Sequence, residues 1–198
     1  MTLADWEIKA VQELNSRMGN PMIDPFVPTP TSKDSEGGKV ISYGLSSAGY
    51  DIRVTDEFKI FSPVVGYGGI AVDPKNFDKR LLQDFKGSVC EIPPHSFILC
   101  RSLERFCIPT DIIATCLGKS TYARCGIIVN VTPLEPGWRG VLTIEISNTS
   151  PSPVKVYANE GIAQLVFSKL KGPALVSYET KGGKYQDQEG IVTARMKE

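Results

Sequence analysis

Short runs of β-branched and aromatic residues dominate the chain from residue 40 onward and constrain its fold more than any other feature. Turn residues separate the runs, as they do in sheets built from short strands. No helical pattern alternates with them, which is what a parallel sheet would require. The pattern therefore predicts an all-β fold, a barrel or a sandwich, whose strands include residues 58–61, 97–100, 127–131, 141–146 and 162–167.

The first 39 residues follow a different pattern. Residues 2–18 carry apolar side chains at roughly helical spacing, with Thr2 as a cap and Gly19 as a stop, and predict one amphipathic helix. Its expected apolar face consists of Leu3, Trp6, Val11 and Leu14. The prolines Pro21, Pro25, Pro28 and Pro30 then predict a loop up to residue 39.

The length of the chain suits one domain. We divide it into a helix and loop (1–39), a β-barrel (40–180) and a hydrophilic C-terminal part (181–198) that opens with two glycines, Gly182 and Gly183. Such a segment is expected to be a flexible lid over a bound ligand.

The charges of the chain balance, with 22 Lys and Arg residues against 22 Asp and Glu residues. Proteins that bind nucleic acid polymers usually carry a net basic field, so a polymer partner is disfavoured. No apolar run approaches the roughly 20 residues of a membrane-spanning helix. Acidic residues stand near the N-terminus where a signal peptide would be apolar. We therefore expect a soluble, cytoplasmic protein with no membrane partner.

Five cysteines occur among apolar neighbours and not in paired short spacings. They predict reduced thiols in the core. A structural zinc site would need paired cysteines or several histidines, and His95 is the single histidine of the sequence. No metal ligand is expected among the side chains.

Residues 118–121 read Gly-Lys-Ser-Thr and precede a stretch that predicts a single helical turn. A cation and two hydroxyls at a helix start suit a phosphate, because the first N–H groups of a helix have no partner within it. Ser120 and Arg124 are four residues apart, so both would lie on one face of this turn and can serve one small site. A capped surface turn without a ligand is the alternative.

Glu145 stands in the middle of an apolar strand. The strand period of two places Leu142, Ile144 and Ile146 on one face and Glu145 on the other. A carboxylate there is either solvent-facing on the wet side of an antiparallel sheet or part of a polar site. The nearby Gly-Lys-Ser-Thr turn favours the site.

Six motifs occur in the order in which dCTP deaminases carry them. They are SSAGYDIR (46–53), LGKSTYARCG (117–126), EPGWRG (135–140), EISN (145–148), NEGIAQLVF (159–167) and GGKYQDQEG (182–190). From residue 42 on, the chain therefore resembles the dCTP deaminases of the dUTPase-like superfamily. The resemblance implies a distorted β-barrel with an N-terminal helix, and a homotrimer whose active sites are shared between neighbouring subunits.

The resemblance also implies the residues of the site. Glu145 matches the catalytic glutamate, Arg124 the arginine that helps to hold it and the base, and Ser120 the serine of the same site. Lys119 stands where many relatives carry arginine, which keeps the phosphate charge but loses the bidentate fork. Other substrate-binding residues implied are Thr121, Thr132, Gln164, Tyr178, Lys184 and Gln188. Asp51 matches an early aspartate of the family, and a turn or interface hydrogen bond is an equal alternative for it.

The implied reaction is hydrolysis of dCTP to dUTP and ammonia, which supplies dUTP for dUMP and dTTP synthesis. The substrate binds as its Mg²⁺ complex, and a water attacks C4 of cytosine while Glu145 carries the protons. Zinc deaminases of nucleobases carry H-x-E and P-C-x-x-C instead, and the sequence contains neither motif. We expect no catalytic zinc.

The sequence leaves three alternative functions open. Glu135 stands near the place of the aspartate that activates water in dUTP diphosphatases, so a bifunctional enzyme that yields dUMP, or a dUTP diphosphatase, competes with simple deamination. The loop between Thr132 and Trp138 is shorter and richer in proline than in some relatives. A nucleotide-binding regulator without turnover is the third alternative, and the combination of Ser120, Arg124 and Glu145 disfavours it.

Overall fold

The computed structural model describes residues 1–62 and 71–196. The helices and strands, in chain order, are α1 (Asp5–Arg17), β1 (Ile23–Asp24), β2 (Thr31–Lys33), β3 (Lys39–Ser46), β4 (Gly49–Phe61), a short 3₁₀ helix η1 (Lys79–Leu81), β5 (Leu82–Lys86), β6 (Val89–Ile92), β7 (Phe97–Cys107), β8 (Ile112–Gly118), α2 (Ser120–Ala123), β9 (Ile127–Asn130), β10 (Arg139–Asn148), β11 (Val154–Tyr157) and β12 (Gly161–Lys169).

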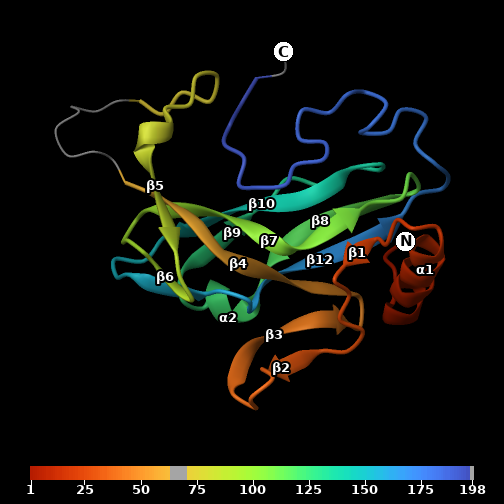
Figure 1. The fold of residues 1–198 in the computed structure, drawn as a ribbon, viewed down its shortest axis with the longest axis horizontal. Coiled ribbons are helices and arrows are strands. Elements are labelled where there is room, and N and C mark those ends of the chain that lie inside the picture. Colours follow the sequence, from red (N-terminus) through yellow and green to blue (C-terminus); the bar gives the residue numbers. More distant parts are fainter. Residues whose placement is uncertain (63–70, 197–198) are drawn as a thin grey trace.

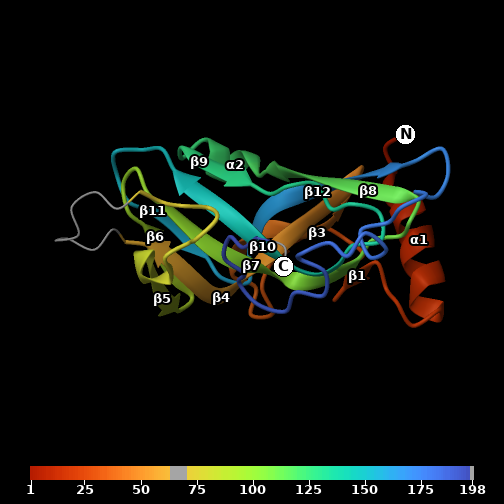
Figure 2. The same cartoon turned by 90° about the horizontal axis from the view of Figure 1, so that it is seen from above.

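Ten of the strands form one sheet, and its paired strands are antiparallel. The main path runs β2-β3-β4-β7-β10-β9, while β12 joins β4 to β8 and so curls the sheet back on itself. Register shifts in the β4–β7, β4–β12 and β7–β10 pairs add to the curvature. Figure 1 shows the resulting half-closed barrel, and Figure 2 shows it from above. The predicted all-β distorted barrel with an N-terminal helix is confirmed.

The N-terminal part differs from the prediction in two respects. The helix begins at Asp5 and not at residue 2, with Ala4 at its N-cap and the Ala4 N–H donating to Glu7 Oε2. Its buried residues are Ile8 and Gln12, whereas Trp6 and Leu14 are exposed.

Gln12 explains which side of α1 is buried. Its side-chain amide donates to the carbonyl of Ile23 at 2.8 Å and accepts from the Ile23 N–H at 2.9 Å. This pair of bonds satisfies backbone groups of β1, and β1 itself pairs with β7 at Phe106 and Arg105. The predicted loop up to residue 39 was wrong in part, because residues 23–24, between Pro21 and Pro25, form strand β1, and residues 31–33, directly after Pro30, form strand β2.

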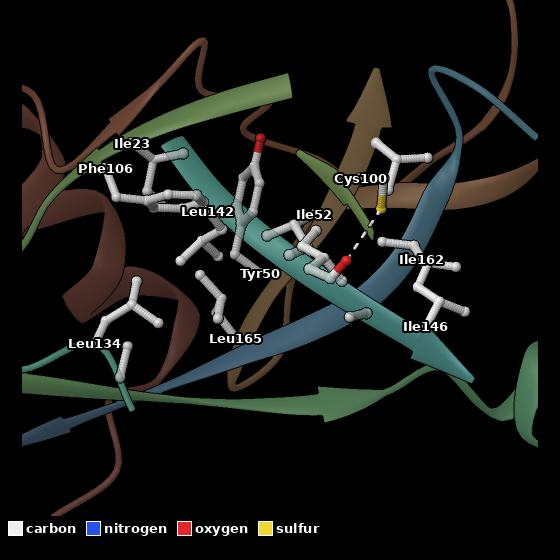
Figure 3. Packing of buried hydrophobic residues seen from close by; sticks show 14 of the residues in the cluster. Ile23, Tyr50, Ile52, Cys100, Phe106, Leu134, Leu142, Ile146, Ile162 and Leu165 are labelled. Carbon is white, nitrogen blue, oxygen red and sulfur yellow. Dashed lines mark hydrogen bonds between the residues drawn. The ribbon is translucent and has the colours of Figure 1, made fainter. Parts of the chain in front are cut away.

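The core lies between the two curled halves of the sheet. Its fully buried side chains include Ile52 from β4, Ile144 from β10 and Leu165 from β12. Figure 3 shows Ile52, Leu142 and Leu165 pointing into this common interior. Burial alternates along β10 from Leu142 to Asn148, as predicted, so Glu145 points away from the apolar core.

Candidate active site

A pocket of about 1070 Å³ lies beside β10 and is covered by the C-terminal segment, which we define as residues 178–196. Five of the residues predicted to bind substrate or act in catalysis line it together: Thr132, Glu145, Tyr178, Lys184 and Gln188. Apolar side chains such as Phe97, Leu99 and Val131 form much of the remaining wall. A cavity of this size with a few convergent polar groups is typical of a small-molecule site.

Glu145 is fixed on this wall by strand pairing on both sides. Its register partner is Leu99 on β7 and Asn130 on β9, so it lies in the interior of the sheet and not at an edge. Burial is the main effect on its carboxyl group and raises its pKa to about 7, although a hydrogen bond to its own backbone N–H acts in the opposite direction. A carboxyl group with this pKa can take up and release a proton near neutral pH. The solvent-facing alternative does not describe this side chain.

The C-terminal segment reaches the pocket by hydrogen bonds to the strand that carries Glu145. The side chain of Gln188 donates to the carbonyl of Val141 at 2.6 Å, and the Val141 N–H donates to the carbonyl of Gln188 at 2.9 Å. The Val192 N–H donates to Thr143 Oγ1 at 3.0 Å. The Val141 bonds pair the segment with the backbone at the start of β10, and the bond to Thr143 lies on the strand face that carries Glu145.

The loop before β10 is held from two sides. The N–H and carbonyl of Leu134 bond to the carbonyl and N–H of Ala114 on β8, at 2.9 and 3.1 Å. Glu135 also lines the pocket, and its carboxylate is in an ion pair with Lys181 of the C-terminal segment. Glu135 is thus paired with a cation in this arrangement.

The other predicted site residues lie elsewhere on the sheet. Lys119 Nζ is 2.5 Å from Asp51 Oδ2, and both side chains are largely buried. Gln164 is the register partner of Asp51, and its side-chain amide donates to Ser46 Oγ at 2.7 Å. Lys119 and Gln164 therefore share a polar cluster with Asp51 and Ser46, and neither is among the described residues that line the pocket.

Helix α2 forms the single turn that the sequence predicts. Arg124 Nη1 donates to the backbone carbonyl of Ser120 at 3.0 Å, so the Arg124 side chain folds back along the turn. Thr121 and Arg124 are exposed to solvent. These three residues are absent from the described lining of the pocket. In both Figure 1 and Figure 2, α2 lies apart from the C-terminal segment. Within one chain, the predicted site residues therefore lie in two separate places, the pocket beside β10 and the region around α2.

Some residues of the pocket were not predicted. Thr143 could have been found from the sequence, since it lies two residues before Glu145 on the same strand face. Trp138 lines the pocket, is 5% exposed and donates its indole N–H to the carbonyl of Tyr185 at 3.0 Å. Tyr185 lies in the GGKYQDQEG motif, but the motif alone gave no direction for its ring.

Within residues 1–62 and 71–196, no group of three or more His, Cys, Asp or Glu side chains could hold a metal ion. None of the described helices is long and apolar enough to cross a membrane. The cysteines are free thiols; Cys90 and Cys100 are buried as expected, whereas Cys107 and Cys116 are only partly buried and Cys125 is exposed. Burial, followed by the charge of Glu145, raises the pKa of Cys116 to about 12, so this thiol stays protonated.

The fold and the pocket together define an all-β protein with a half-buried carboxylate on the wall of a small-molecule site. A family model described as dCTP deaminase-like matches residues 32–170. The dCTP deaminase of Campylobacter hominis is 61% identical over 179 residues, which cover 90% of this chain and 90% of that protein. The dCTP deaminase of Burkholderia mallei is 56% identical over 170 residues, or 86% of this chain and 88% of that protein. The chain belongs to the dCTP deaminase family.

A solved structure supports the fold. The 2'-deoxycytidine 5'-triphosphate deaminase from Agrobacterium tumefaciens matches with a TM-score of 0.57 and 18% sequence identity, over 84% of this chain and 47% of that chain. This chain thus spans about half the length of that protein. At such identity the likeness concerns the fold alone.

Proposed function

We propose that this protein hydrolyses dCTP to dUTP and ammonia, with Glu145 as the group that moves the protons. The observation that carries the proposal is the position of Glu145 in a dCTP deaminase family member: a carboxyl group on the wall of the pocket, whose pKa burial raises to about 7. At neutral pH the carboxylate accepts a proton from the attacking water. It delivers this proton to N3 of cytosine, then takes the proton of the new C4 hydroxyl group and passes it to the amine, which leaves as ammonia when the C4–N bond breaks.

The active site is assembled between subunits of a homotrimer in this proposal. Ser120 and Arg124 lie outside the pocket of their own chain, and the exposed apolar side chains Leu117 and Ile128 flank α2, at 53% and 56% exposure. Exposed apolar side chains next to functional groups are typical of a surface that another chain covers. We infer that Ser120 and Arg124 of one subunit complete the pocket of its neighbour, where they orient the water and the base.

The triphosphate end is assigned to cations and donors on both sides of that interface. Lys119, Thr121 and Gln164 would come from one chain, and Tyr178, Lys184 and Gln188 from the C-terminal segment of the other. The side chains described here include no carboxylate cluster for a metal, and Mg²⁺ commonly binds through substrate phosphates with few protein ligands. The residues therefore fit a magnesium ion held by the triphosphate, which neutralises part of the phosphate charge.

The proposed product is dUTP and not dUMP. Cleavage between the phosphates would need a second carboxylate near the α-phosphate, and Glu135 lines the pocket as the candidate. Its carboxylate is paired with Lys181, and Pro133 and Pro136 stiffen its loop. Misplacement of about 1 Å can cost roughly 10² in rate, so a paired and restricted glutamate is a poor replacement for the aspartate of the diphosphatases.

Product analysis tests this proposal. Purified protein is incubated with dCTP and Mg²⁺, the nucleotides are separated, and ammonia is measured in parallel; dUTP is tested as a substrate in a second reaction. We expect one ammonia per dUTP formed, no consumption of dUTP, and no effect of a zinc-selective chelator. Formation of dUMP and pyrophosphate that Glu135→Gln abolishes would show a bifunctional enzyme. Loss of activity that zinc alone restores would reject the metal-free chemistry.

A further inference from the structure

We infer that Asp187 is a positioning residue for substrate binding: together with Arg139 and Arg105 it fixes the C-terminal segment so that Lys184 and Gln188 stay at the pocket. The inference rests on the proposed function only in taking Lys184 and Gln188 as ligands of dCTP. Asp187 itself is not among the described residues that line the pocket. It therefore acts through its neighbours in the chain.

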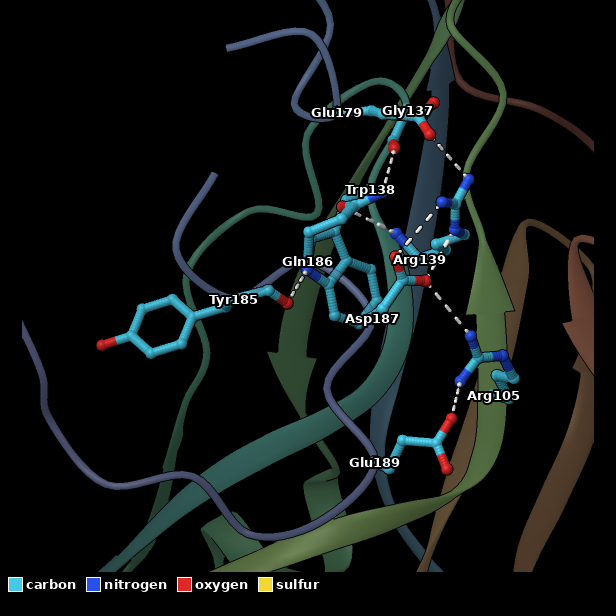
Figure 4. Close-up of polar contacts among 9 residues, drawn as sticks. All are labelled: Arg105, Gly137, Trp138, Arg139, Glu179, Tyr185, Gln186, Asp187 and Glu189. Atoms are coloured by element: carbon cyan, nitrogen blue, oxygen red, sulfur yellow. Dashed lines mark hydrogen bonds and ion pairs between the residues drawn. The ribbon is translucent and has the colours of Figure 1, made fainter. Parts of the chain in front are cut away.

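Asp187 is at the centre of an ion-pair cluster made by Arg105, Arg139, Glu179, Asp187 and Glu189. Arg139 binds its carboxylate in a fork, with Nε–Oδ1 at 2.6 Å and Nη2–Oδ2 at 3.1 Å. Arg105 reaches Asp187 Oδ1 at 3.4 Å. Arg139 also contacts Glu179 at 3.0 Å, and Arg105 contacts Glu189 at 3.2 Å. Figure 4 shows Arg105 and Arg139 side by side on the sheet, facing the acidic residues of the segment.

The backbone of the segment meets β10 at the same point. The Asp187 N–H donates to the carbonyl of Arg139 at 2.9 Å, and Gln188 forms a parallel bridge with Gly140. Gly140 has a φ of +143°, and a Cβ there would lie 2.9 Å from the carbonyl oxygen of Gln188. The close approach of the segment therefore requires glycine at this position. Charge pairing and backbone geometry specify one docking site.

This docking site connects the segment to the catalytic strand. Lys184 and Gln188 stand on either side of Asp187 in the chain, and both line the pocket. β10 carries Arg139 at its start and Glu145 further along. The side chains of Arg139 and Asp187 are 38% and 45% exposed, and exposed ion pairs are individually weak. Their loss is therefore expected to shift the segment between docked and undocked states without unfolding the barrel.

Asp187→Asn keeps the shape of the side chain but removes its charge. We expect the KM for dCTP to rise about 2- to 5-fold while kcat changes less than about 1.5-fold, because closure contributes to binding. The ratio of mutant to wild-type KM should approach one at about 0.5 M salt, where the ion pairs are screened. Arg139→Gln should behave alike, and the double variant should be no worse than either single variant.

Hydrogen–deuterium exchange measures the docking of the C-terminal segment in the absence of substrate. Amides of residues 183–192 should exchange about 5-fold faster in Asp187→Asn than in the wild type, with the barrel strands unchanged. The matched control is Glu91→Gln, which removes an exposed carboxylate paired with Lys155 far along the chain and should alter neither readout. Unchanged exchange and KM in Asp187→Asn, or additive effects in the double variant, would overturn the inference. If the wild type released no ammonia from dCTP, the proposed function would be rejected. Faster exchange in Asp187→Asn than in the wild type would still establish the docking role of Asp187.

Discussion

Glu145→Gln should lower the turnover of dCTP by at least about 10²-fold while dCTP binding is retained, because the amide preserves the shape of the side chain and cannot carry a proton. Steady-state ammonia release measures the turnover, and calorimetric titration with dCTP measures the binding. The backbone pairing of β10 with β7 and β9 holds residue 145 in place, and this pairing does not involve the side chain. The substitution should therefore leave the fold intact. Normal turnover in this variant would remove Glu145 from the mechanism.

The pH dependence of stability and of kcat/KM, compared between the wild type and Glu145→Gln, supplies a control for this variant. The pKa of Glu145 is raised to about 7, so the folded chain holds a proton at pH values where the unfolded chain has released it. The wild type should therefore lose stability as pH rises from about 5 to about 7, relative to Glu145→Gln. Its kcat/KM should fall as pH drops below about 7, because the protonated carboxyl group cannot accept a proton from water. If melting temperatures and rates changed with pH in the same way in the wild type and in Glu145→Gln across this range, the raised pKa of Glu145 would be contradicted.

Truncation after Thr180 should reduce kcat/KM for dCTP by about 10²-fold or more. The deletion removes Lys184 and Gln188, and hydrogen bonds to charged groups contribute about 1.5–3 kcal/mol each. It also uncovers Trp138, which donates to Tyr185. The apolar core cluster contains no residue after Tyr178 among those described, so the circular dichroism spectrum of the barrel should be retained. A truncated protein with wild-type kinetics would show that the C-terminal segment has no part in binding.

Local patterns allowed much of this fold to be predicted. The period of two in residues 141–148 places Glu145 opposite the core, and the turn residues between apolar runs indicate an all-β chain. The face of α1 could not be read in this way, because it depends on Gln12 and its bonds to the backbone of Ile23. A buried glutamine looks polar in the sequence, and only its distant partner makes the burial favourable.

The site was predicted as a set of residues but not as an arrangement. Motif order identified Glu145, Ser120 and Arg124, whereas the curled sheet places α2 apart from the pocket that contains Glu145. The docking of the C-terminal segment was also beyond prediction, since Arg139 and Asp187 are far apart in the chain and their charges alone indicate no pairing. Long-range contacts of this kind follow from topology, which single-sequence patterns do not determine.

In the proposed trimer, Glu145 and the Ser120–Arg124 turn serve one dCTP site although a single chain holds them apart. Subunit complementation tests it most directly. Glu145→Gln and Arg124→Gln, each inactive alone, are tagged differently and co-expressed, and mixed oligomers are purified by both tags. In a shared site, the intact glutamate of one subunit meets the intact arginine of the next.

A mixed trimer contains two subunits of one variant and one of the other, so one of its three shared sites would contain both intact residues. We therefore expect the purified mixed trimers to recover about a third of the wild-type rate of ammonia release, and a doubly mutated chain, Glu145→Gln with Arg124→Gln, mixed with either single variant to recover none. Mixed oligomers of the two single variants that release no ammonia would contradict the account, because the two residues would then not meet across a subunit interface.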